Sequence, residues 1–94
     1  MLSDWEYMKL NDKYITYEIN GEKLLVCTDG SRFSGMVRLN ETAEKIVETI
    51  KVDRTREEHI EELLKEFSGV SKEELSIDFD DVIEKLSSVK AVDF

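Results

Sequence analysis

Residues 14–28 read Tyr-Ile-Thr-Tyr-Glu-Ile-Asn-Gly-Glu-Lys-Leu-Leu-Val-Cys-Thr, and this stretch decides the fold. Its centre, Asn20-Gly21, is a strong hairpin signal, because both central residues of a type I′ turn need a positive φ. On either side, residues 14–19 and 22–28 carry the alternating apolar pattern of half-buried strands. The stretch therefore predicts a tight β-hairpin.

The register of this hairpin follows from the two-residue loop. Tyr17 is expected opposite Leu24, and Ile15 opposite Val26, so that these four side chains share one face. Ile19 lies on the same face. We expect this face to be the half-buried side of the sheet.

A third strand is predicted after the reversal at Asp29-Gly30. It spans residues 33–39, with Phe33, Gly35, Val37 and Leu39 on one face and Met36 and Arg38 on the other. If the sheet follows chain order, this strand is an edge whose outer N–H and C=O groups are unpaired. Only Arg38 guards that edge against an added strand.

Beyond Leu39 the apolar period changes from two to 3.6, which is typical of helices. Asn40 is the expected N-cap of a first helix with the apolar stripe Ala43, Ile46, Val47 and Ile50. A capping box of Thr55 and Glu58 opens a second helix, with the stripe Ile60, Leu63, Leu64 and Phe67 and an end at Gly69.

A third helix is predicted from the capping box of Ser71 and Glu74. Its apolar stripe consists of Leu75, Phe79, Val82, Ile83 and Leu86. The predicted fold class is α+β: an N-terminal three-stranded antiparallel sheet followed by three helices. We expect residues 1–94 to form a single domain, with residues 1–12 as a flexible N-terminal segment.

Composition excludes several classes of protein. Hydrophobic residues make up 40% and charged residues 37% of the 94 residues, which is a globular balance. The net charge is −9. Residues 1–40 have six acids and five bases, whereas residues 41–90 have fifteen acids and eight bases. This acidic half has the wrong sign for nucleic acids and for anionic membranes.

We expect a cytoplasmic protein. No apolar run approaches the ~20 residues that span a bilayer, and the N-terminus lacks the basic and apolar regions of a secretory signal. The single cysteine, Cys27, cannot form an internal disulfide, which agrees with a reducing compartment.

No catalytic set is evident, and we predict that the chain is not an enzyme and uses no cofactor or metal. His59 is the only histidine and is expected on the exposed flank of the second helix. Cys27 is expected to be a small half-buried core residue rather than a reactive thiol. Four acids cluster on the third helix and are expected to form a solvated acidic face: Asp78, Asp80, Asp81 and Glu84.

The stretch Phe33-Ser-Gly-Met-Val-Arg-Leu-Asn-Glu-Thr-Ala43 resembles the strand-to-helix junction of the PqqD family, in which L-N-E-T-A or L-N-E-T-G follows an aliphatic strand. Ile60-Glu-Glu-Leu-Leu64 and Val82-Ile-Glu-Lys-Leu86 are similar to later helical motifs of that family. The resemblance covers roughly residues 14–92. Two departures are Val47, where many relatives have tryptophan, and Lys90-Ala-Val, where many have G-L-[LIV].

The resemblance implies a RiPP recognition element with a winged helix-turn-helix-like fold. Such a domain is a peptide chaperone that binds the leader segment of a ribosomally made precursor in natural product biosynthesis. The leader docks as a strand on the third strand, against the third helix, and the partner is a modifying enzyme, commonly a radical-SAM maturase. The expected peptide-binding residues here are Met36, Val37, Arg38, Leu39, Asp78, Val82 and Lys85.

Three other classes stay open on the sequence. One is an interaction or regulatory domain that forms a homodimer through the same edge. Another is a winged-helix nucleic-acid binder, which the charge of −9 disfavours. The third is a small thiol enzyme built on Cys27, which a normal thiol pKa would exclude.

Overall fold

The hairpin predicted around Asn20-Gly21 is present in the computed structural model of the chain, which describes residues 5–30 and 35–94. Strands β2 (Tyr14–Ile19) and β3 (Glu22–Cys27) pair antiparallel, with Ile19 opposite Glu22 and Tyr17 opposite Leu24. Asn20 and Gly21 have φ angles of 52° and 80°, as a type I′ turn requires. Both the turn and the predicted register are confirmed.

Strand β4 (Met36–Leu39) pairs antiparallel with β3 and completes a sheet of order β2-β3-β4. It is shorter than the predicted strand 33–39: Gly35 lies outside it, and residues 33 and 34 lie outside the described residues. Val37 and Leu39 turn toward the core, whereas Met36 and Arg38 are exposed, as the alternation predicted.

The core lies on the opposite face of the hairpin from the one expected. Tyr14 and Leu25 are buried, whereas Ile15, Tyr17 and Ile19 are 39%, 51% and 51% exposed. The expectation of a half-buried Ile15 face is therefore wrong. Both faces of this hairpin carry apolar side chains, so that alternation fixes which residues share a face but not which face the helices cover.

Three helices follow the sheet: α1 (Glu41–Ile50), α2 (Arg56–Glu66) and α3 (Lys72–Ser88). Each predicted N-cap is present, with Asn40, Thr55 and Ser71 accepting backbone N–H groups at 2.8, 3.2 and 3.2 Å. Three residues of the predicted stripes, Leu64, Phe67 and Val82, are only partly buried. The buried helix residues are His59 and the rest of the stripes: Ala43, Ile46, Val47, Ile50, Ile60, Leu63, Leu75, Phe79, Ile83 and Leu86.

A second sheet, absent from the predicted order, closes the other end of the molecule. Strand β1 (Tyr7–Leu10) lies between β5 (Arg54–Thr55) and β6 (Val92–Asp93), so that the described chain has six strands in two sheets. Met8 of β1 is fully buried. The expected flexible segment 1–12 is thus corrected for residues 7–10, which form the central strand of this sheet.

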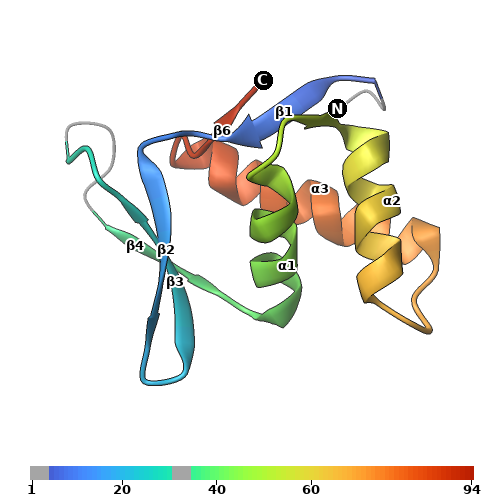
Figure 1. Cartoon of the computed structure of the whole chain (residues 1–94), viewed down its shortest axis with the longest axis horizontal. Coiled ribbons are helices and arrows are strands. Elements are labelled where there is room, and N and C mark those ends of the chain that lie inside the picture. Colours follow the sequence, from blue (N-terminus) through green and yellow to red (C-terminus); the bar gives the residue numbers. More distant parts are fainter. Residues whose placement is uncertain (1–4, 31–34) are drawn as a thin grey trace.

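Figure 1 shows how these parts are arranged. The β2–β3 hairpin extends to one side of the helices, and β1 runs across the top beside β6. One core cluster joins both sheets to all three helices, including Met8 from β1, Leu25 from β3 and Phe79 from α3. Within residues 5–30 and 35–94, no helix combines the length and apolarity that crossing a membrane would demand.

Candidate functional site

The outer edge of β4 is open. The strand pairs with β3 on one side, and no other strand of the described residues pairs with its second side. Such an edge presents backbone donors and acceptors to an incoming strand.

The register identifies which backbone groups of β4 point outward. In a hairpin with a two-residue loop, Ile19 and Glu22 form a hydrogen-bonded pair, and bonding alternates along each strand from there. Val37 lies opposite Leu25, so its N–H is directed to β3. The N–H groups of Met36 and Arg38 are therefore those directed away from the sheet.

Helix α3 has two distinct flanks beside its buried stripe. Asp80 lies on the flank that faces α2, because Arg56 donates to its two carboxylate oxygens at 2.9 and 3.0 Å. At about 100° per residue, Asp78, Val82 and Lys85 lie on the opposite flank. We call this second group the free flank of α3. Val82 is partly buried against the core, whereas Asp78 and Lys85 are exposed.

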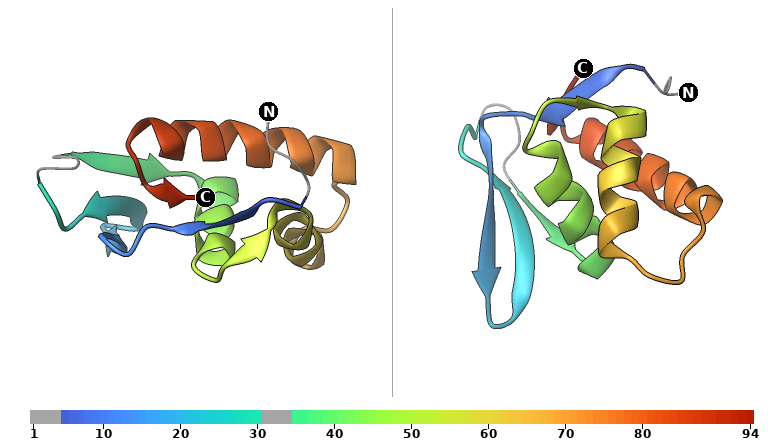
Figure 2. Two further views of the ribbon diagram at one scale, coloured as in Figure 1. Left: turned by 90° about the horizontal axis from the view of Figure 1, so that it is seen from above. Right: turned by 45° about the vertical axis from the view of Figure 1, so that its right-hand side comes forward.

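β4 and the free flank meet at the margin of one core. The side chains of Val37 and Val82 pack against the same cluster of buried residues. In the left view of Figure 2, β4 is the strand of its sheet on the side where α3 lies. The structure thus brings the strand residues and the helix residues expected from the sequence to one side of the molecule.

Leu39 differs from the other expected site residues. It is only 9% exposed and belongs to the core. Its side chain supports the strand and is not available as a contact surface. Met36, at 65% exposure, and Arg38 carry the accessible side chains of β4.

The charges at the site are mostly in solvent. Arg38 lies 3.9 Å from a carboxylate oxygen of Glu22 on β3, with 81% of its side chain exposed, which makes this a weak surface pair. Asp78, Asp81 and Glu84 are exposed as the sequence suggested, whereas Asp80 is half-buried beside Arg56. Electrostatic attraction for a basic ligand at this flank therefore comes from Asp78, which belongs to the free flank, and from the exposed Asp81 next to it.

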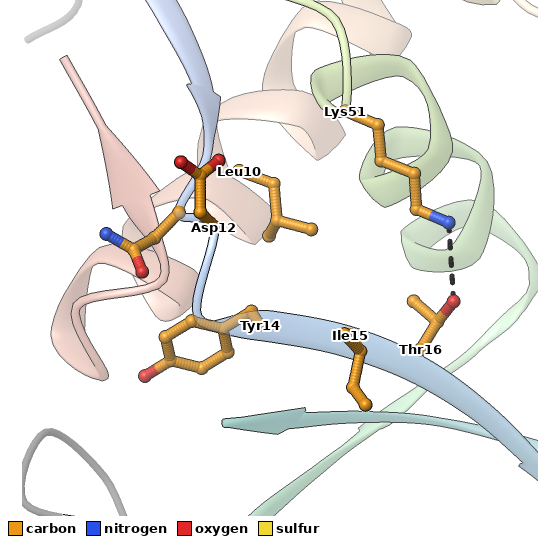
Figure 3. A pocket seen from close by; sticks show the side chains of 7 residues that line it. Leu10, Asp12, Tyr14, Ile15, Thr16 and Lys51 are labelled. Atoms are coloured by element: carbon orange, nitrogen blue, oxygen red, sulfur yellow. Dashed lines mark hydrogen bonds between the residues drawn. The ribbon is translucent and has the colours of Figure 1, made fainter. Parts of the chain in front are cut away.

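The sheet has a second edge at β2, and the side chain of Lys51 lies beside this edge. Lys51, at the end of α1, donates to the Thr16 hydroxyl at 3.3 Å, as Figure 3 shows. It also donates to Glu48 at 2.9 Å. These contacts lie beside a shallow hollow that Leu10 and Asp12 also line. A lysine side chain beside an edge strand is one of the features that disfavour strand addition there.

His59 is not on the surface as expected but fully buried. Its Nε2 donates to the backbone oxygen of Met8 at 2.8 Å, and its ring stacks on Phe79 with centroids 6.0 Å apart. Nδ1 has no hydrogen-bond partner among the described residues. Burial lowers the pKa of His59, opposed in part by the hydrogen bond to Met8. The burial of His59 could have been predicted from its spacing, because His59 stands four residues before buried Leu63 and residues four apart share a helix face.

Cys27 is half-buried at the end of β3, as expected for a small residue at the margin of the core. Its Sγ lies 3.2 Å from the backbone oxygen of Asp29. Among the residues that the structure describes, no group of three or more acidic, histidine or cysteine side chains is placed to hold a metal ion.

The geometry defines a class: a small α+β domain whose open strand edge lies beside an exposed helix flank. The chain belongs to the PqqD family, since the family model described as coenzyme PQQ synthesis protein D (PqqD) matches residues 19–92. This is the family of RiPP recognition elements, whose members are non-catalytic accessory proteins that bind a peptide during biosynthesis. Neither the curated proteins nor the solved structures contain a match.

Proposed function

We propose that this chain is a non-catalytic peptide chaperone that binds the leader segment of a ribosomally synthesised precursor. The leader adds as a strand to the outer edge of β4 and packs against the free flank of α3. The chain then presents the precursor to a modifying enzyme, such as a radical-SAM maturase.

One observation carries this proposal: β4 has an unpaired edge on the side of the molecule where α3 lies. Main-chain hydrogen bonds from Met36 and Arg38 would give affinity, and contacts with Val82 would give selectivity. Asp78 and Asp81 favour a leader that carries lysine or arginine at this point. The family membership agrees with a peptide as the ligand.

The fold and the surroundings of the chaperone form part of the proposal. The β2–β3 hairpin would correspond to the wing of a winged helix-turn-helix arrangement, and the protein would act in the cytoplasm. The net charge of −9 opposes nucleic-acid binding, which a gel shift at low salt would test.

The test first identifies a short open reading frame beside the gene and then titrates the N-terminal peptide that it encodes into the isotope-labelled chain. We expect the largest amide shifts at β4 and along the free flank of α3. Arg38→Pro should abolish binding, because proline removes an outward N–H while leaving the β3–β4 ladder in place. Val37→Pro is a poorer probe, since it removes a donor that β4 itself needs.

Glu18→Pro is the matched control. By the same alternation, the N–H of Glu18 points outward from the opposite edge of the sheet, at β2. Peptide affinity should be unchanged in a folded Glu18→Pro variant. The proposal fails if folded Arg38→Pro binds as tightly as the unmodified chain, or if the shifts fall on β2.

A further inference from the structure

The face of the β2-β3-β4 sheet that points away from the helices is apolar and open. Tyr17, Ile19 and Met36 on this face are 51%, 51% and 65% exposed. Exposed apolar patches of this kind mark interaction surfaces more often than isolated apolar residues do. We call this surface the outer face; it consists of Ile15, Tyr17, Ile19, Leu24, Val26 and Met36.

The strand register makes the outer face one continuous patch. Ile15, Val26 and Met36 lie directly opposite one another across the three strands. Leu24 lies between Tyr17 and Arg38 in the next row. Leu24 is only 7% exposed, although it lies in the middle strand of the outer face. The side chains therefore form a contact surface rather than scattered apolar positions.

The charge pattern favours a second copy of the chain as the occupant. The charged residues that β3 and β4 place on the outer face are Glu22 and Arg38. Arg38 Nε lies 3.9 Å from Glu22 Oε2, so the two opposite charges offset each other. The helical residues 41–90 carry fifteen acids against eight bases, so the net charge of −9 is concentrated away from this face. Two copies therefore repel each other least when their outer faces meet.

The pairing is also self-complementary. In a two-fold arrangement the same patch meets itself, so Glu22 of one copy can approach Arg38 of the other. Two apolar sheet faces pack at a separation of about 10 Å, as in a β-sandwich. We propose that the outer faces of two copies associate in this way to form a two-fold dimer.

The size of the patch limits how tightly two copies of the chain can bind each other. Three strands about 4.8 Å apart and six residues long cover a footprint of roughly 14 by 20 Å. That footprint, about 280 Å², is well below the roughly 800 Å² per partner that a standard specific interface buries. The dimer is therefore weak and depends on concentration. The dimer leaves the outer edge of β4 and the free flank of α3 open. Dimerisation and the proposed peptide binding therefore use different surfaces, and the dimer does not rest on the proposed function.

The experiment is sedimentation equilibrium of the whole chain from about 5 to 500 μM, a range that brackets micromolar affinity. The weight-average mass should rise from one chain toward two. Tyr17→Lys, between Ile15 and Ile19 on β2, should raise the midpoint concentration at least tenfold. Because lysine reduces the net negative charge, general repulsion cannot explain such a loss.

Val52→Lys is the matched control, because Val52 is 52% exposed and Tyr17 51%. It makes the same exposed apolar-to-cationic change away from the outer face and should dimerise like the unmodified chain. A monomer at every concentration overturns the proposal. So do equal effects of the two lysine variants, or a dimer that Arg38→Pro abolishes and Tyr17→Lys leaves intact, which would indicate pairing through the β4 edge.

Discussion

Arg56 of α2 binds Asp80 of α3 through two parallel hydrogen bonds, from Nε to Oδ1 at 2.9 Å and from the second guanidinium nitrogen to Oδ2 at 3.0 Å. The Arg56 side chain is only 12% exposed, so this fork-shaped pair fixes the packing of one helix on the other. Asp80 therefore has a structural role, whereas Asp78, Asp81 and Glu84 of the same acidic cluster are exposed.

Asp80→Ala should therefore lower the free energy of unfolding. The loss should be about 1–2 kcal/mol, because two charge-assisted hydrogen bonds to a largely buried guanidinium are removed. Urea denaturation followed by circular dichroism measures the change. Asp81→Ala is the control, since Asp81 is exposed and should change stability by less than about 0.5 kcal/mol. Equal effects of the two variants would contradict a structural role for the Arg56 pair.

The exposed acids should govern how fast a basic leader associates. Replacing Asp78 and Asp81 together by asparagine should slow association by about threefold or more at low salt, because steering by the local field is lost. The dependence of the rate on salt should also become shallower. Stopped-flow mixing with a fluorescent leader peptide measures both quantities.

Glu73→Gln with Glu84→Gln is the matched control for this charge change. These two acids are exposed and lie on the α2 side of α3, away from the free flank. The pair removes the same charge but should leave the association rate nearly unchanged. If both double variants slow association equally, the net charge of the chain and not the free flank attracts the peptide.

The sequence predicted those features that neighbouring residues determine. Asn20-Gly21 fixed the hairpin, and Thr55 with Glu58 formed both hydrogen bonds of the predicted capping box. Strand β1 was missed because its partners lie far along the chain: Met8 pairs with Arg54, and Leu10 with Val92. Its partners β5 and β6 have two residues each, which is too short to show the alternating apolar pattern of a strand.

The candidate site was predictable to a similar degree. Chain order suggested that β4 is an edge, and the sheet order confirms it. The position of Asp80 was not predictable, since only tertiary structure brings Arg56 beside it. The same applies to His59, which is buried between Met8 of β1 and Phe79 of α3. Local pattern thus located the elements, whereas contacts between helices decided which side chains are accessible.

Lys90 begins the Lys90-Ala-Val stretch, at which the sequence departs from the pattern that the family resemblance implies. It has a φ of 61°, in the left-handed region that favours glycine. It closes α3 in a Schellman motif: its N–H donates to the oxygen of Ser87 at 3.0 Å, and that of Ala91 to Leu86 at 2.9 Å. The motif is intact, but the β-carbon of Lys90 strains the backbone in this conformation.

Lys90→Gly should relieve this strain and raise the free energy of unfolding by about 0.5–1 kcal/mol. The corresponding rise in Tm is a few degrees, roughly 4–8 °C per kcal/mol for a domain of this size. Lys90→Ala keeps the β-carbon and removes only the rest of the side chain. Calorimetry should therefore find no gain for Lys90→Ala, and a gain as large as that of glycine would place the effect in the lysine side chain.

The buried His59 should make stability depend on pH. Burial lowers its pKa in the folded chain, and the nearby Arg54 lowers it further, while Met8, Glu58 and Asp53 act in the opposite direction. The unfolded chain therefore takes up a proton near pH 6.5 that the folded chain binds only at lower pH. Stability is full above about pH 6.5 and falls as the pH drops below it, by at most about 1.4 kcal/mol per pH unit.

His59→Phe isolates this contribution, because phenylalanine fills the site beside Phe79 but cannot titrate. The variant loses the hydrogen bond to Met8, so at pH 7.5 it should be less stable than the unmodified chain. Between pH 7.5 and 5.5 the unmodified chain should lose stability faster, so that the difference narrows. Chemical denaturation across that range measures both curves. Parallel curves would mean that His59 has the same proton affinity in the folded and unfolded chains, despite its burial.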